Sequence, residues 1–309
     1  MLIWGHMALL ATATTGAPLT WGQAVLLAVL QGFSELFPIS SLGHSVILPA
    51  LLGWGNVQKH DTFVPFLTLL HLGTAAALGV FYRDRWARVI RAFVTSATRG
   101  RLSHTPDEHL AWMLFFGTIP AGVLGAVLEH TIKGLFATPV IAAIFLAVNG
   151  VIMLFGERLR GRQGGAGGLQ VRPDEPEGRR GVADLTWREA TMVGAAQALA
   201  LIPGISRSGV TMCAGLLINM RHEEAANYTF MLATPIIAAA GVLEAPTLFS
   251  YGPTVIQQAL VGGVLAAITA YISVRFLTRY FHTGRLDPFA YYCIVAGLAS
   301  LAYILAHGA

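Results

Sequence analysis

Long apolar runs are the main feature of this chain, and they predict helices that cross a membrane. A helix needs about 20 mostly apolar residues to span the hydrocarbon core of a bilayer. Six runs of this length lie near residues 63 to 81, 109 to 128, 138 to 155, 225 to 243, 255 to 274 and 288 to 306. They lack the period-two alternation of membrane β-barrel strands. We therefore expect an all-α integral membrane protein with six transmembrane helices.

Two further apolar regions, residues 21 to 52 and 187 to 220, are broken in the middle. The breaks contain Pro38 and Pro203, and each half is short for a membrane span. Irregular backbone at membrane depth occurs where it is buried in protein or lines a wet cavity. Each region therefore predicts a re-entrant helical hairpin; for residues 187 to 220, two short tilted spans are the alternative.

Basic residues give the orientation. Six of the 20 Lys and Arg lie in residues 83 to 101 and seven in 158 to 188, with three more at Arg275, Arg279 and Arg285. Basic loops stay in the cytoplasm. The three basic segments all fall on the cytoplasmic side of the membrane only if residues 187 to 220 enter and leave the membrane from the cytoplasm. The hairpin of residues 21 to 52 then enters from the opposite face.

The resulting order is a hairpin and three spans, followed by a second, inverted hairpin and three spans. We expect one polytopic domain over 1–309, with a first repeat at 21–155 and an inverted second repeat at 187–309. Residues 156–186 are rich in Gly, Pro and charge, and predict a flexible cytoplasmic linker. Four pairs match at a constant offset of 166, namely Gln31 and Gln197, Ile39 and Ile205, Ser40 and Ser206, and Gly43 and Gly209.

Composition agrees with a membrane protein. With 55% hydrophobic and 12% charged residues, the chain has too little polar surface for a soluble globule. We attribute the formal charge of +4 to orientation signals and expect no nucleic-acid partner. Cys213 and Cys293 lie in apolar stretches, which gives no support for a disulfide or a cysteine metal site. Residues 1 to 20 lack a basic segment ahead of an apolar core, so we expect no cleaved signal peptide.

Glu35 and Arg207 are the candidate functional charges, because each lies deep in an apolar stretch beside a break. A purely structural salt bridge between them is the alternative. The polar neighbours favour a site. They are Gln31, Ser40, Ser41 and His44 around the first break, and Ser206, Ser208 and Thr211 around the second.

The second break resembles an anion cradle. Ser206 is placed to cap the following half-helix, whose N–H groups and dipole favour an anion. Arg207 adds a planar fork for phosphate oxygens, and the hydroxyls of Ser206, Ser208 and Thr211 can donate hydrogen bonds. Together these residues predict phosphate binding.

The first break supplies oxygen ligands and proton-transfer groups. Gln31 and Glu35, four residues apart, suit a hard divalent cation bridging phosphate oxygens. His44 is a candidate general acid, general base or nucleophile. His71 stays open between a site neighbour and a packing residue.

These residues resemble the signatures of the bacterial undecaprenyl-pyrophosphate phosphatase family of the bacitracin-resistance type. The matching segments are Gln31-Gly32-Phe33-Ser34-Glu35, then Pro38, Ser40, Ser41, Gly43 and His44, and finally Pro203-Gly204-Ile205-Ser206-Arg207-Ser208-Gly209-Val210-Thr211. The similarity runs from about residue 21 to the C-terminus, except for the linker.

The resemblance implies hydrolysis of C55 polyprenyl pyrophosphate to the monophosphate, which recycles the lipid carrier for peptidoglycan, and so implies bacitracin resistance. It implies a Mg²⁺ or Ca²⁺ requirement and an inner-membrane location with a site open to the outer face. It assigns a catalytic or metal role to Glu35, and catalysis and pyrophosphate binding to Ser41, His44, Ser206, Arg207 and Thr211. Gln31 stands where Glu is commoner, which removes one negative ligand.

Several questions stay open at the level of sequence. A phosphohistidine, a phosphoserine and direct attack by water are all compatible with these residues. A polyprenyl-phosphate flippase or secondary transporter is the alternative function, because inverted repeats with broken helices also build transporters. A second lipid phosphatase class fits poorly, since its Pro-Ser-Gly-His signature is missing from the chain. A homo-oligomer is also open.

Overall fold

The structure is a computed structural model, and it describes residues 19–55, 57, 60–100, 104–135, 138–165, 180–248 and 250–307. The regular elements in these ranges are helices, with one isolated bridge between Arg180 and Met220. Most of the first 20 residues, on which the signal-peptide expectation falls, lie outside the described residues.

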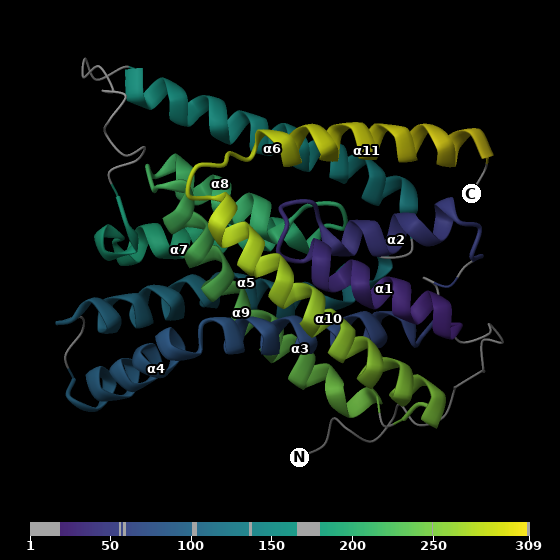
Figure 1. Cartoon of the computed structure of the whole chain (residues 1–309), viewed down its shortest axis with the longest axis horizontal. Coiled ribbons are helices and arrows are strands. Elements are labelled where there is room, and N and C mark those ends of the chain that lie inside the picture. Colours follow the sequence, from purple (N-terminus) through teal and green to yellow (C-terminus); the bar gives the residue numbers. More distant parts are fainter. Residues whose placement is uncertain are drawn as a thin grey trace.

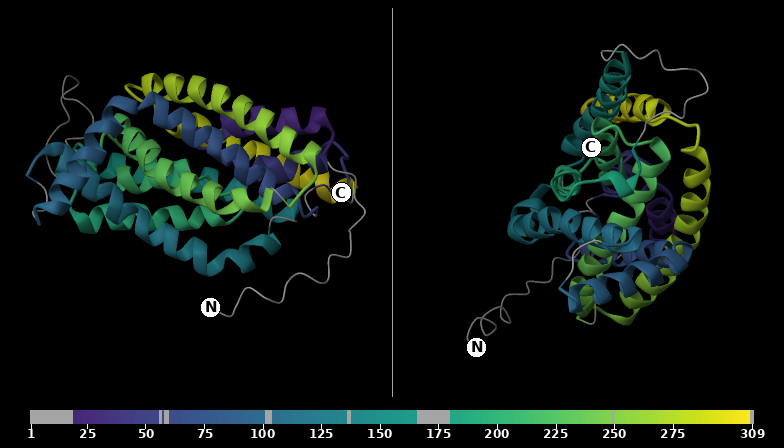
Figure 2. Two further views of the ribbon diagram at one scale, coloured as in Figure 1. Left: turned by 90° about the horizontal axis from the view of Figure 1, so that it is seen from below. Right: turned by 90° about the vertical axis from the view of Figure 1, so that its left-hand side faces the viewer.

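Six long helices confirm the six predicted apolar runs. Each is long and apolar enough to cross a membrane within the described part of the chain. They are α3 (Phe63–Phe81), α5 (Pro106–Leu135), α6 (Pro139–Gly165), α9 (His222–Leu248), α10 (Pro253–Tyr280) and α11 (Asp287–His307). In the left view of Figure 2 long helices lie side by side, roughly along the longest axis of the molecule.

Both predicted breaks are present. The first separates α1 (Trp21–Ser34) from α2 (Ser41–Leu51), and the second separates α7 (Trp187–Ala196), with its 3₁₀ turn, from α8 (Arg207–Leu217). Pro38 and Pro203 lie in the breaks, where a missing N–H and a fixed φ stop a helix from continuing. In Figure 1, α1 and α2 lie toward one end of the long axis, and α7 and α8 toward the other.

The basic segment that we expected as a loop after residue 83 is instead a helix, α4 (Arg83–Thr98). Val89 and Ser96 of α4 are buried, whereas Ile90 and Val94 are exposed. Phe93 packs against Trp112 of α5, with ring centroids 5.0 Å apart and the ring planes tilted by 52°. One side of α4 is therefore buried, because its apolar residues recur at helical spacing. The charge pattern alone did not show that this segment packs against α5.

The predicted linker is shorter than expected, because α6 continues through Gly165. Glu157, at the start of the predicted linker, is 2% exposed and accepts hydrogen bonds from His222 Nε2 (2.8 Å) and Leu286 N (2.7 Å). These contacts tie the end of α6 to α9 and to the start of α11. Residues 166–179 lie outside the described residues, and residues 182–184 form a 3₁₀ turn.

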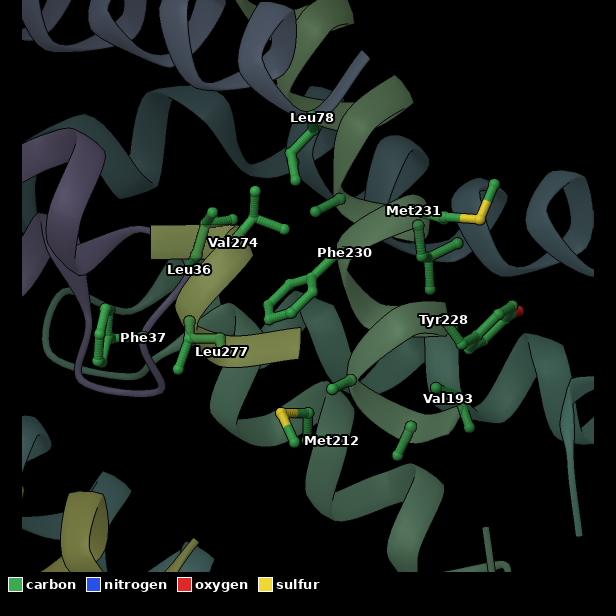
Figure 3. Packing of buried hydrophobic residues seen from close by; sticks show 14 of the residues in the cluster. Leu36, Phe37, Leu78, Val193, Met212, Tyr228, Phe230, Met231, Val274 and Leu277 are labelled. Atoms are coloured by element: carbon green, nitrogen blue, oxygen red, sulfur yellow. The ribbon is translucent and has the colours of Figure 1, made fainter. Parts of the chain in front are cut away.

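The two halves of the chain interleave. Helix α1 packs on α10 from the second half, α7 packs on α5 from the first half, and α6 packs along α11. The main core joins the same halves: Figure 3 shows Phe230 of α9 among Leu36 of the first break, Leu277 of α10 and Met212 of α8. The halves therefore share one hydrophobic core, which brings the two breaks together.

Candidate active site

Two serines cap the half-helices that begin at the breaks. Ser40 Oγ accepts from Gly43 N (3.1 Å) at the start of α2, and Ser206 Oγ accepts from Gly209 N (3.2 Å) at the start of α8. All four residues belong to the pairs that match at an offset of 166. Each half-helix therefore begins with the same capping hydrogen bond, and the residue after each cap starts its helix.

Those two starting residues, Ser41 and Arg207, meet at the carboxylate of Glu35. Arg207 Nη2 donates to Oε1 (2.5 Å), and Ser41 Oγ donates to Oε2. Gln31 Nε2 also donates to Oε2 (2.8 Å) from one turn earlier on α1. Glu35 is only 7% exposed, so a buried carboxylate joins both breaks.

His71 of α3 belongs to the same cluster, which answers the question that the sequence left open. Its Nε2 lies 3.2 Å from Oε2 of Glu35, and its Nδ1 lies 2.7 Å from the carbonyl of Leu67. A carbonyl only accepts, so Nδ1 carries the proton and donates to Leu67. With Arg207 on the other oxygen, Glu35 lies between a guanidinium and an imidazole, two groups that can also contact an anionic ligand.

His44 points elsewhere. Its Nδ1 donates to the carbonyl of Ser40 (2.7 Å), and its Nε2 accepts from the hydroxyl of Tyr292 on α11 (2.8 Å). The two rings are nearly parallel, with centroids 5.7 Å apart. His44 is therefore held beside the first break by Tyr292, a residue that the sequence did not suggest.

The candidate phosphate-binding hydroxyls lie at the second break, and most are engaged with backbone. Ser208 Oγ donates to the carbonyl of Phe37 (3.0 Å) and lies 3.0 Å from Ser206 Oγ. Thr211 Oγ1 donates to the carbonyl of Arg207 one turn earlier (2.7 Å). Ser208 thus connects the two breaks directly, and Thr211 stabilises the first turn of α8.

The breaks also touch through glycines. A Cβ added at Gly43 would lie 2.8 Å from Cα of Gly204. Gly204 itself has φ 102° and faces the backbone of α6, where an added Cβ would lie 2.3 Å from the carbonyl oxygen of Ala142. This close approach leaves no room for larger residues at either position.

The polar contacts of Glu35 bear on the expected divalent cation. Its two oxygens accept from an amide, a hydroxyl and a guanidinium and face an imidazole. Among the described residues, no three His, Cys, Asp or Glu side chains gather closely enough to hold a metal. Gln31 and Glu35 as arranged here do not fit a resident Mg²⁺ or Ca²⁺ ion, because hydrogen-bond donors occupy the carboxylate.

Sequence reasoning also missed Asn149 of α6, which is 0% exposed and hydrogen-bonded to both breaks. Its signal was present in the sequence, since an amide interrupts the apolar run of residues 138 to 155.

Comparisons with known proteins show the family of this chain. Residues 24–299 match the family described as bacitracin resistance protein BacA. The chain is 47% identical over 289 residues to an undecaprenyl-diphosphatase of Granulibacter bethesdensis, covering 91% of this chain and 96% of the relative. It is 45% identical over 302 residues to one of Mycolicibacterium paratuberculosis, covering 93% and 98%. It is 43% identical over 331 residues to undecaprenyl-diphosphatase 2 of Frankia alni, covering 90% and 96%. With this match spanning both breaks and five of the six long helices and ending within the sixth, α11, the chain belongs to the BacA bacitracin resistance family.

Proposed function

We propose that this chain hydrolyses undecaprenyl pyrophosphate to undecaprenyl phosphate and inorganic phosphate, as the names of its relatives indicate for them. The observation that carries the proposal is the meeting of Ser41 and Arg207 on the buried carboxylate of Glu35. Hydrolysis recycles the lipid carrier of peptidoglycan synthesis. It also removes the pyrophosphate that bacitracin sequesters, which accounts for resistance.

Arg207 and the start of α8 bind the pyrophosphate in this proposal. The guanidinium turns from Oε1 of Glu35 to the phosphate oxygens, where its fork can bind two of them. The capped N-terminus of α8 adds backbone N–H groups and a positive dipole end. Charge that develops on the bridging oxygen is then stabilised electrostatically, which is usually the largest contribution to phosphoryl transfer.

Ser41 is the nucleophile that the hydrogen bonds support best. Its hydroxyl already donates to Glu35, which is the pairing of nucleophile and base expected for covalent catalysis. Ser41 Oγ attacks the terminal phosphorus, its proton passes to Glu35, and undecaprenyl phosphate leaves. Water then hydrolyses the phosphoserine and releases phosphate. His44, held by Tyr292, takes no part in the first proton transfer.

The divalent cation belongs to the substrate in this proposal. Because donors occupy Glu35, we place Mg²⁺ or Ca²⁺ on the pyrophosphate oxygens, with which it enters the site. The six apolar helices support a multi-pass membrane protein. We further propose that both broken helix pairs are re-entrant, that the halves form an inverted repeat in the inner membrane, and that the site opens to the outer face.

The decisive experiment measures phosphate release from a polyprenyl pyrophosphate by purified protein in detergent. We expect Glu35→Gln and Arg207→Lys each to lower kcat by about 100-fold or more, the scale for losing one preorganised charge contact. The matched controls are Glu223→Gln on α9 and Arg91→Lys on α4, which lie away from the breaks. EDTA should abolish activity and Mg²⁺ or Ca²⁺ should restore it. If folded wild type released no phosphate, hydrolysis would be abandoned and lipid-phosphate transport in liposomes measured instead.

Acid quenching tests the nucleophile. Substrate labelled in its terminal phosphate should label the wild-type protein at Ser41, and Ser41→Ala should carry no label. A label that is stable to base and labile to acid would indicate phosphohistidine. A base quench is therefore run in parallel, and a wild type that is unlabelled after both rapid quenches would indicate direct attack by water.

A further inference from the structure

Asn149 makes two hydrogen bonds to the backbone of the two breaks. None of the functions assigned to the site so far accounts for them. Asn149 Nδ2 donates to the carbonyl of Pro38 in the first break (3.1 Å), and its Oδ1 accepts from the backbone N–H of Ser206 in the second (3.0 Å). The partners fix the orientation of the amide, since a carbonyl can only accept and a backbone N–H can only donate. One side chain thus connects both breaks to α6.

The two backbone groups lie at functional positions. Pro38 follows Glu35 by three residues, and Ser206 immediately precedes Arg207. Neither group belongs to a regular helix, and a buried backbone group left without a partner costs about 1–3 kcal/mol. Asn149 is bonded to both groups and thereby sets the separation of the segments that hold Glu35 and Arg207; the carbonyl of Pro38 also accepts a longer hydrogen bond from Cys293 Sγ (3.7 Å).

The packing around Asn149 leaves the amide little freedom. The side chain is 0% exposed, and its Nδ2 also lies 3.4 Å from Sγ of Cys293 on α11. A Cβ at the neighbouring Gly150 would lie 2.4 Å from the carbonyl oxygen of Ala290, so α6 and α11 are in close backbone contact here. The amide is therefore supported by a rigid helix pair, as a positioning group requires.

Within the described part of the chain, the hydrogen bonds of Asn149 go to Pro38, Ser206 and Cys293 and not to Glu35 or Arg207 themselves. Ser208 also joins the breaks, through its hydrogen bond to Phe37, so the breaks stay together when Asn149 is lost. Loss of the amide changes their alignment instead. A displacement of about 1 Å at a reacting group can lower a rate about 100-fold.

We propose that Asn149 is a positioning residue that aligns the two breaks for hydrolysis, an inference that rests on the proposed function. Asn149→Leu keeps a similar volume and removes both hydrogen bonds. Asn149→Asp can still accept from Ser206 but places an oxygen against the carbonyl of Pro38. Both variants should lower kcat per folded molecule about 10- to 100-fold, with KM changed less than about threefold.

A double-mutant cycle separates positioning from simple destabilisation. If Asn149 acts by aligning Glu35 and Arg207, Asn149→Leu should lower the activity of Arg207→Lys protein only a little further. The guanidinium that Asn149 aligns is already absent from that variant. The matched control is Gln258→Leu, which removes another buried amide, one that donates to the carbonyl of Leu19 (2.6 Å). It should lower the melting temperature and leave kcat per folded molecule unchanged.

Hydrogen–deuterium exchange gives a readout that does not depend on activity. Asn149→Leu should speed exchange in peptides covering both breaks, residues 36–43 and 204–209, and leave peptides of α5 and α10 unchanged. Faster exchange at one break only, wild-type kcat, or losses that multiply with Arg207→Lys would overturn the positioning role. An inactive wild type would refute the proposed function, and exchange would still decide whether Asn149 connects both breaks.

Discussion

At the scale of single residues, the site depends on side chains that differ chemically but occupy equivalent places. Ser41 and Arg207 both follow a capping serine, both begin a half-helix, and both donate to Glu35. Ser41 and Arg207 are themselves 166 positions apart, so they occupy corresponding positions although their side chains differ. The capping hydrogen bond is the same at both breaks, although Ser40 has φ 67° and Ser206 has φ −86°, and the next residue carries a hydroxyl in one break and a fixed positive charge in the other.

The contact between Gly43 and Gly204 gives a prediction at this scale. Gly43→Ala places a methyl group 2.8 Å from backbone, and overpacking of this kind costs about 1–3 kcal/mol. We expect a lower melting temperature and a loss of phosphate release, because Gly43 lies two residues after Ser41. Thermal unfolding in detergent and the kinetic assay measure the two effects.

Gly79→Ala on α3 is the matched control. It also lies within a helix, but an added Cβ meets no atom within 4 Å. Alanine is favoured over glycine in a helix by up to about 1 kcal/mol, so this variant should be as stable as wild type or more so. Equal stability of Gly43→Ala and Gly79→Ala would contradict the close contact of the two breaks.

At the scale of elements, the ends of the half-helices are specified by their caps. Helix α7 begins with a capping box, in which Thr186 Oγ1 accepts from Glu189 N (3.3 Å) and Glu189 Oε2 accepts from Thr186 N (2.9 Å). Arg180 adds two hydrogen bonds to Glu189, at 2.6 Å and 2.9 Å. The segment before α7 is therefore tied to its first turn.

This cap predicts a dependence of stability on pH. The hydrogen bonds from Arg180 hold the pKa of Glu189 at about 2, below its usual 4.5. A carboxyl with a lowered pKa stabilises the fold above its unfolded pKa, and this stability is lost as pH falls from about 4.5 toward 2. Glu189→Gln should be less stable than wild type at pH 7 and should lose less stability between pH 5 and pH 3. Melting temperatures across this range test it, with Glu223→Gln as the control, and parallel curves for wild type and Glu189→Gln would contradict it.

At the scale of the whole molecule, the interleaved packing explains why the site is shared. Helix α1 packs on α10 and α7 packs on α5, so each broken helix pair is supported by a long helix of the other half. Glu35 and Arg207 are 172 residues apart and still form one ion pair. We expect neither half to form the site alone.

The proposed re-entrant topology is testable by cysteine labelling in intact cells. Trp21→Cys and Leu52→Cys, at the outer ends of α1 and α2, should both react with an impermeant maleimide from outside. Ala183→Cys and Leu217→Cys, which flank α7 and α8, should react only after the cells are opened. All four side chains are exposed, and the native Cys213 and Cys293 are buried. Labelling of the two ends of one pair from opposite sides would show a full crossing and reject the inverted repeat.

The sequence by itself determined the six long helices, the two breaks and the identity of the central charges. These follow from local physics, because a helix must be apolar over its length to cross a bilayer, and proline or a capping serine ends or begins it wherever it folds. The cost of a charge at membrane depth singled out Glu35 and Arg207 without any knowledge of their contacts.

Only the tertiary structure decided how these parts meet. The rotation and register of each helix determine that His71 reaches Glu35, that His44 reaches Tyr292, and that Asn149 reaches both breaks. Hydropathy does not contain this information, since it records that a residue is in the membrane and not which neighbour it faces. The same rotation and register place Ser41, His71 and Arg207 around the carboxylate of Glu35.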